Sequence, residues 1–73
     1  MIHLTPQETA LLAVLENNRG KIITRNFLMT SVWGYPSDTR TRTLDVHIQH
    51  LRKKFGGSLH IETIYRVGYR LCS

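Results

Sequence analysis

Cations and hydrogen-bonding side chains recur at helical spacing between positions 42 and 55 of this sequence, beside a separate set of apolar residues. At about 100° per residue, a narrow apolar stripe that must face a protein core is formed by Leu44, Ile48, Leu51 and Phe55. The opposite face carries Arg42, Val46, Gln49 and Lys53, and the flank beside it carries Thr43, His47, His50 and Lys54. A helix over residues 42–55 is about 20 Å long and fits the ~12 Å wide major groove of B-DNA. The spacing therefore predicts a helix that packs with one face and can contact a nucleic acid with the other.

Charge is unevenly distributed along the 73 residues, whose formal net charge is +5. Residues 1–39 contain three Lys or Arg against three Asp or Glu, whereas residues 40–73 contain seven against two. A cationic half suits a polyanionic partner, because each neutralised phosphate releases counterions. The alternative is a basic surface that serves only solubility.

The composition excludes several classes of protein. A chain of 73 residues that is 41% hydrophobic suffices for one modest core, so we expect a single domain over residues 1–73. A single cysteine, Cys72, forms neither a disulfide framework nor a zinc site of several thiolates, which favours a reducing compartment. No segment approaches the ~20 apolar residues of a membrane helix, and the first residues do not form a secretory leader. We expect a soluble, unprocessed cytoplasmic protein without membrane contact.

The first part of the chain carries clear signals for a helix and a short strand. Thr5, Pro6 and Glu8 form a capping box with proline in the first turn, which predicts the start of a helix. Residues 17–20 hold asparagines and a glycine and are expected to end it. Residues 21–23 include adjacent isoleucines and are brief, so we expect a small strand that depends on a partner.

A second helix is expected to begin after Thr24, an N-cap candidate. Three of its residues are expected to pack on the first helix: Phe27, Leu28 and Val32. Gly34 and Pro36 prevent it from continuing. Trp33, beside this break, is expected either to plug the core or to place its indole at a phosphate or a partner protein.

The second half predicts a third helix and a hairpin. Thr41 is the candidate cap of the third helix, which begins at residue 42 or 43 and ends before Gly56. Alternating apolar and polar residues predict a β-hairpin over residues 59–72 with its tip at residues 65–68. Within the tip, we expect Gly68 to adopt positive φ, because only glycine does so cheaply.

Three helices followed by a hairpin is the order of a winged helix-turn-helix, in which the hairpin is the wing. The sequence resembles one family closely in four places: Leu4–Glu8, Trp33-Gly34-Tyr35, the run from Arg42 to Phe55, and Ile61–Ile64 with Gly68-Tyr69-Arg70. These stretches resemble the C-terminal DNA-binding domain of OmpR/PhoB-type bacterial response regulators over nearly the whole chain. The fold class is accordingly mainly α with small β. The N-terminal sheet of the family is largely missing, because only residues 2–4 look like its last strand.

The resemblance implies sequence-specific binding of double-stranded DNA by the effector domain of a two-component transcriptional regulator. The helix over residues 42–55 is then expected in the major groove, with the hairpin near the minor groove. Implied partners are promoter DNA with direct repeats, a second copy arranged head to tail, and RNA polymerase or a neighbouring copy at loop 34–41. The receiver domain of such regulators is absent from this chain. No cofactor, metal or catalytic residue is implied.

The resemblance also assigns roles to individual residues. Phosphate or backbone contacts are implied for Arg42, Thr43, His47, Arg52, Trp33, Thr63 and Tyr69. Val46 is expected against a thymine methyl, and His50 occupies a base-reading position. The same DNA-facing surface includes Gln49, Lys53 and Lys54, and the tip adds Tyr65 and Arg66.

Several of these residues have a structural alternative. For Arg52 it is an ion pair with Glu16 or Glu62. The two lysines that follow Arg52 also suit the dipole of the helix C-terminus. Asp45 is expected to cap the helix or to pair with Arg42 or Arg25.

The sequence departs from the family pattern at two positions. Many relatives place arginine where this chain has His50, and a neutral histidine offers one donor and one acceptor instead of a bidentate fork. In the wing, the cation expected near the minor groove has moved by one place, to Arg66.

Other functions fit the residues less well. His47 and His50, with His60, have spacing compatible with a metal site, but a cationic face disfavours a dication. An enzyme is not suggested, because no Ser-His-Asp or Cys-His arrangement is present and Cys72 lies at the end of the chain. The main rival is a winged-helix module that binds protein or RNA without reading DNA sequence.

Overall fold

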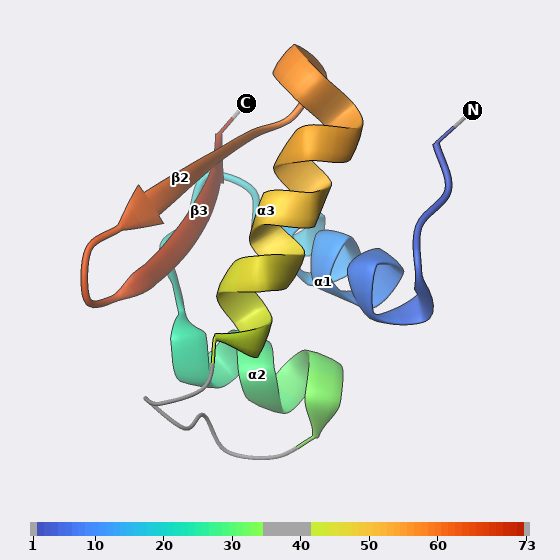
Figure 1. Ribbon diagram of the computed structural model, residues 1–73. Coiled ribbons are helices and arrows are strands. Elements are labelled where there is room, and N and C mark those ends of the chain that lie inside the picture. The colour runs from blue at the N-terminus through green and yellow to red at the C-terminus, as the bar shows by residue number, and fades with distance from the viewer. Residues whose placement is uncertain (1, 35–41, 73) are drawn as a thin grey trace.

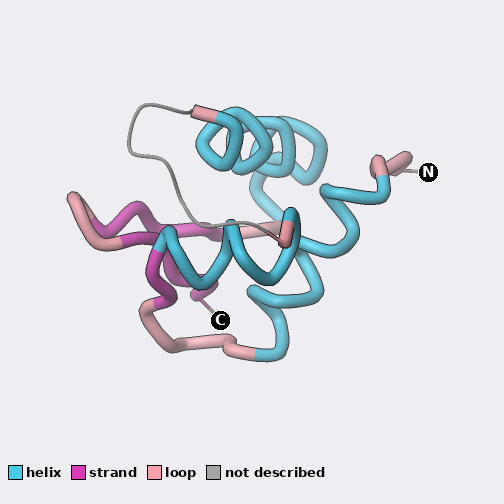
Figure 2. Tube along the Cα trace, turned by 90° about the horizontal axis from the view of Figure 1, so that it is seen from below, coloured by secondary structure: helices cyan, strands magenta, loops and turns pink. Residues whose placement is uncertain are grey.

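Three helices pack around a small antiparallel sheet in the computed structural model, which describes residues 2–34 and 42–72 (Figure 1). The helices are α1 (Pro6–Asn17), α2 (Arg25–Trp33) and α3 (Thr43–Phe55), and a 3-10 turn, η1 (Gly56–Ser58), follows α3. The strands are β1 (Ile23–Thr24), β2 (His60–Ile64) and β3 (Gly68–Cys72). Figure 2 shows the strands gathered on one side of the helices. The predicted order of three helices and a C-terminal hairpin is confirmed.

Side chains cap the first two helices as predicted. The Thr5 hydroxyl accepts the Glu8 N–H at 3.2 Å, and the Glu8 carboxylate accepts the Thr5 N–H at 2.9 Å, which completes the capping box of α1. The Thr24 hydroxyl accepts the Phe27 N–H at 3.1 Å at the start of α2. Gly34 ends α2 in the left-handed conformation, with φ of 82°.

The cap predicted for α3 is wrong. The N-cap of α3 is Arg42, which makes no capping hydrogen bond with its side chain, so Thr41 does not hold that position. Residues 2–4, which resemble the last strand of the family's N-terminal sheet, form no strand here, in agreement with the expected lack of that sheet, and none of the described strands pairs with them. Thr41 itself, Tyr35 and the rest of the loop up to Thr41 lie outside the described residues.

The sheet joins the segment before α2 to the hairpin, in the order β1-β3-β2. β1 runs antiparallel to β3, with Ile23 opposite Tyr69 and Thr24 opposite Gly68. β2 pairs with the other edge of β3, where Ile61 lies opposite Leu71. The small strand expected over residues 21–23 is confirmed in part, because it is confined to Ile23–Thr24, and the partner on which it depends is β3 of the hairpin.

The wing needs Gly68 for a reason different from the predicted one. Positive φ in the turn belongs to Arg66, at 62°, and not to Gly68. A Cβ atom at position 68 would instead lie 1.8 Å from the carbonyl oxygen of Ile23. Glycine is required here because the backbone of β1, which pairs with β3, lies too close to position 68 for any side chain.

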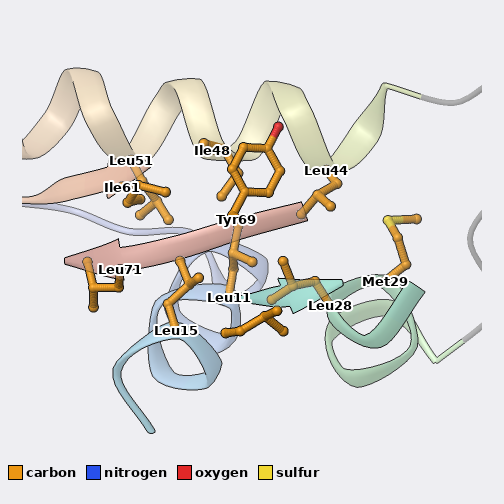
Figure 3. Packing of buried hydrophobic residues seen from close by; sticks show 11 residues of the cluster. Leu11, Leu15, Leu28, Met29, Leu44, Ile48, Leu51, Ile61, Tyr69 and Leu71 are labelled. Atoms are coloured by element: carbon orange, nitrogen blue, oxygen red, sulfur yellow. The ribbon is translucent and has the colours of Figure 1, made fainter. Parts of the chain in front are cut away.

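The core lies between α3, the sheet and the other two helices (Figure 3). Its fully buried residues include Leu11, Leu15, Leu28, Met29, Leu44, Leu51 and Leu71. The apolar stripe predicted for α3 is thus confirmed. One prediction for α2 is wrong, because Phe27 is 50% exposed and Met29 fills the core position beside Leu28.

Candidate nucleic-acid interface

The face of α3 opposite its buried stripe is open to solvent. Val46 is 46% exposed, although it is apolar, and His50 and Lys53 are exposed on the same side. Arg42 and Gln49 are exposed as well. The two-faced helix predicted from the sequence is confirmed, with an apolar side chain in the middle of a cationic and polar surface.

On one flank of this surface, His47 is held between α3 and α2. Its Nδ1 lies 2.8 Å from the carbonyl oxygen of Thr43, and its ring meets the ring of Trp33 edge-on at a centroid distance of 4.9 Å. Trp33 is half-buried against the core, as the packing alternative for this residue predicted. His47 is therefore fixed in orientation and only partly exposed.

On the opposite flank, Asp45 joins three elements. Its Oδ1 accepts a hydrogen bond from Nη1 of Arg25 in α2 at 2.5 Å and another from the Tyr69 hydroxyl of β3. Burial opposes ionisation of Asp45, but the bonds from Arg25 and Tyr69 outweigh it, so the pKa of this carboxyl is lowered. Burial and the bond to Asp45 raise the pKa of Tyr69 to about 12. The predicted pairing of Asp45 with Arg25 is confirmed.

Tyr69 is placed differently from an exposed phosphate ligand. Its side chain lies in the core with its hydroxyl directed toward α3, between Leu44 and Ile48 (Figure 3). The phenol has a single proton, and it is donated to Asp45. The structure thus gives Tyr69 a contact that orients β3 against α3.

Arg52 connects α3 to the hairpin. Its Nη2 donates to the carbonyl oxygen of Ile61 at 2.6 Å and to the Thr63 hydroxyl at 2.9 Å. Its guanidinium also lies over the Tyr69 ring, 5.9 Å from the centroid. The alternative expected for Arg52, an ion pair with Glu16 or Glu62, does not form, because Glu16 pairs with Arg19 and Glu62 pairs with Arg70. Since Thr63 accepts from Arg52, its own hydroxyl proton remains available to another acceptor.

The wing tip presents an aromatic and a cationic side chain together. Tyr65 is 79% exposed, and the Arg66 guanidinium lies 5.2 Å from the centroid of its ring. Val67 beside them is 43% exposed. The basic, aromatic tip predicted from the sequence is confirmed, and the backbone of Arg66 within it is left-handed.

Glu8 holds the C-terminal half of α3 against α1. Its carboxylate is almost fully buried and accepts Nζ of Lys54 at 2.6 Å, while Nδ1 of His50 lies 3.5 Å away. Lys54 also donates to the carbonyl oxygen of His3 at 2.9 Å. The hydrogen bonds from Lys54 and then from the Thr5 backbone lower the pKa of Glu8. Lys54 is thus engaged with α1, on the side of α3 away from the wing.

This contact predicts a pH dependence of stability. A carboxyl whose pKa is lowered on folding stabilises the fold above its ordinary pKa, here 4.5, and loses that contribution as the pH falls through the lower folded value. Glu8→Gln keeps the shape and an acceptor oxygen but not the charge. We expect it to lower the free energy of unfolding by about 1 kcal/mol at neutral pH.

Urea unfolding of both proteins measures this effect. The gap between wild type and Glu8→Gln should close as the pH falls well below 4.5, since wild-type Glu8 then becomes neutral too. A gap that stays constant over this range would show that the charge on Glu8 contributes nothing.

Three described residues have a placement that the sequence did not predict. Glu8 was assigned only to its capping box, yet it also binds Lys54, which lies 46 positions along the chain. The exposed apolar group of Ile22 and Phe27, each 50% exposed, was also missed. A carboxylate at the third position of a helix signals a cap, and nothing in its spacing indicates a partner in α3.

Neither a metal site nor a membrane-spanning helix is present among residues 2–34 and 42–72. Within these ranges no group of three or more His, Cys, Asp or Glu side chains is arranged to hold a metal ion. None of the helices described there has both the length and the apolar character to cross a membrane.

Comparisons with known proteins agree with this geometry. The family model described as transcriptional regulatory protein, C terminal, matches residues 1–71. The response regulator PmrA of Pseudomonas aeruginosa is 41% identical over 68 residues, which cover 93% of this chain and 30% of PmrA. The chain thus spans about a third of the length of the curated relatives it matches.

Solved structures show the same fold. The DNA-binding domain of CpxR from E. coli matches with a TM-score of 0.91 at 29% identity, over 99% of this chain and 74% of that one. The DNA-binding domain of Klebsiella pneumoniae RstA, solved in complex with the RstA box, matches with a TM-score of 0.86 at 28% identity, over 97% and 74%. This chain is therefore a winged helix-turn-helix that belongs to the OmpR/PhoB-type family of C-terminal transcriptional regulatory domains, a family of DNA-binding regulators and not of enzymes.

Proposed function

We propose that this chain binds double-stranded DNA in a sequence-specific manner as the effector domain of a two-component transcriptional regulator. α3 enters the major groove, and the β2–β3 hairpin approaches the neighbouring minor groove. The observation that carries the proposal is the outward face of α3, where exposed Val46 lies among exposed cationic and polar side chains. A helix in water gains nothing from such a valine, whereas the C5-methyl group of thymine is an apolar partner in the major groove.

The centre of the outward face is suited to base edges. Val46, Gln49 and His50 project from it with apolar, amide and imidazole groups, and Lys53 adds a cation. These groups differ in hydrogen-bonding capacity, so together they distinguish base pairs in the major groove.

The flanks of α3 are suited to the sugar-phosphate backbone. The first turns of α3 carry Arg42, Thr43 and His47. Thr63 in β2 offers its hydroxyl proton. Arg52 and Tyr69 make hydrogen bonds within the protein, so we assign them to positioning the wing. A phosphate contact of Arg52 would use the guanidinium nitrogens other than Nη2, which donates to Ile61 and Thr63. Such contacts fix register and carry no sequence information.

The hairpin tip supplies the minor-groove contact. Arg66 is held beside exposed Tyr65 at the end of the wing. An arginine in a narrow minor groove is attracted by its negative potential. Trp33 and Lys54, which pack against the protein, contribute at most at the edge of the interface.

The partners follow from the family. We propose promoter DNA with direct repeats, a second copy bound head to tail, and activity in the bacterial cytoplasm. A receiver domain acts from outside this stretch of sequence, and loop 34–41 contacts RNA polymerase or the neighbouring copy. The RstA domain, solved with its DNA box, supports the DNA partner.

Selection of bound duplexes from a random pool tests the proposal. We expect one sequence pattern to be enriched, and binding of the enriched duplex to weaken with salt at a slope of about −0.9 per phosphate contact in a log–log plot. A pool without enrichment, or an affinity unaffected by salt, would instead favour the rival module that binds protein or RNA.

Paired substitutions on α3 separate base contacts from phosphate contacts. Val46→Ala should cost about 1 kcal/mol on the enriched duplex and less on one with the contacted thymine replaced. Arg42→Ala should weaken both duplexes equally and reduce the salt slope by about one. Both side chains are exposed, so neither substitution should alter the circular dichroism of the chain. Equal losses on both duplexes for Val46→Ala would remove it from the base-reading surface.

A further inference from the structure

His47 occupies the boundary between the outward face of α3 and α2. It follows exposed Val46 directly in the sequence, and its ring contacts the ring of Trp33. A residue on the flank of a helix in the major groove faces the wall of the groove, where the phosphates lie. Resting on the proposed function, the ligand next to His47 is therefore a DNA phosphate and not a base edge.

The hydrogen bond of His47 determines which ring nitrogen carries a proton. Nδ1 lies 2.8 Å from the carbonyl oxygen of Thr43, and a carbonyl oxygen can only accept. Nδ1 must therefore be protonated to make this bond. In a neutral imidazole the other nitrogen, Nε2, then has a lone pair and no proton.

A phosphate oxygen is also only an acceptor. The neutral ring of His47 consequently has no donor for a phosphate, because its single N–H is used by Thr43. Only the imidazolium form offers both the internal bond from Nδ1 and a charge-assisted bond from Nε2. We infer that DNA binding by this chain takes up one proton at His47, so that affinity falls as the pH rises through the range in which histidines titrate.

The groups that face His47 leave this role intact. On its own helix, the ring of His50 lies 6.1 Å away between centroids, and the Thr43 carbonyl accepts from Nδ1. On α2 the facing ring belongs to Trp33, which does not titrate. On α1, Glu8 is directed at His50 and Lys54, so its carboxylate holds those two side chains.

The test uses the full 73-residue chain and the most enriched duplex of the selection above. Fluorescence anisotropy between about pH 5 and pH 8 measures the affinity at constant ionic strength. For wild type we expect the affinity to fall with rising pH by up to about tenfold per pH unit, the limit for one linked proton. His47→Gln, whose amide can still donate to Thr43 but never carries a charge, should lose most of this dependence.

His50→Gln is the matched control, because it removes a neighbouring histidine on the same helix. It should shift affinity or sequence preference and keep the pH dependence. A dependence that survives in His47→Gln, or one that disappears in His50→Gln instead, overturns the inference. An affinity of wild type that is independent of pH also overturns it and leaves the proposed DNA binding intact.

Nitrogen NMR of the ring gives a second, direct measurement. In the free chain, at a pH where the ring is neutral, we expect the proton of His47 on Nδ1, and in the complex we expect both nitrogens protonated at that same pH. A proton on Nε2 in the free chain would contradict the inference even if DNA binds. If the selection enriches no duplex, the proposed function fails and the inference falls with it, whereas an enriched duplex that binds independently of pH overturns the inference alone.

Discussion

Gly68→Ala is expected to lower the free energy of unfolding by about 3 kcal/mol. The added Cβ would lie 1.8 Å from the carbonyl oxygen of Ile23 and 2.9 Å from Cα of Thr24. Both atoms belong to the backbone of β1, so no rotation of a side chain can relieve the clash. β1 must separate from β3, with loss of the pairing of Ile23 with Tyr69. Urea unfolding followed by circular dichroism measures the loss.

Gly57→Ala is the matched control for this substitution. A Cβ at position 57 meets no atom within 4 Å, and the residue does not have positive φ. We expect its stability to stay within about 0.5 kcal/mol of wild type. Hydrogen exchange at the backbone amides of β1 should accelerate in Gly68→Ala alone. Equal stability of the two variants would show that β1 adjusts without cost.

Asp45→Ala is expected to lower the free energy of unfolding by about 2 kcal/mol, because it leaves the Arg25 guanidinium and the Tyr69 hydroxyl without their acceptor. Tyr69 is a buried residue, and the Arg25 side chain is only 26% exposed. Asp45 itself is 33% exposed, so solvent screens part of the ion pair and the two hydrogen bonds carry most of the effect. Chemical unfolding of the variant measures the cost.

Two further variants separate these contributions. Asp45→Asn retains an oxygen that can accept from both donors and loses only the charge, so we expect about half of the cost. In the double variant Asp45→Ala with Tyr69→Phe, the loss should be smaller than the sum of the two single losses, since no hydroxyl is left unpaired. Strict additivity would show that the hydrogen bond between Asp45 and Tyr69 does not stabilise the fold.

The elements of this fold were predictable wherever their signals are local. The capping box at Thr5 and Glu8, the Thr24 cap and the apolar stripe of α3 all depend on residues within a few positions of one another. The split of α3 into a buried and an outward face was predictable for the same reason, because helical periodicity assigns the two faces.

The contacts that position the site could not be predicted, because they depend on how distant segments meet. The requirement for Gly68 arises from the path of β1, which lies more than 40 positions earlier in the sequence. Lys54 has the spacing of an outward-facing cation, yet Glu8 binds it from α1. Tyr69 has the alternation of a strand residue, and only the packing of β3 under α3 shows where its hydroxyl goes. Phe27 and Met29 are two positions apart in α2, and the way in which this helix packs on the rest of the protein decides which of them is buried.

The bonds of Arg52 and Asp45 fasten α3 to both strands of the hairpin, since Arg52 binds β2 and Asp45 binds β3. In the binding mode proposed above, α3 and the wing both contact DNA, and a fixed separation between them prevents adjustment to the width or curvature of a duplex. The duplex has to deform, and the energy of that deformation depends on how stiff its base steps are. Base pairs that no side chain touches, between the α3 contacts and the wing contact, should therefore influence affinity through their flexibility.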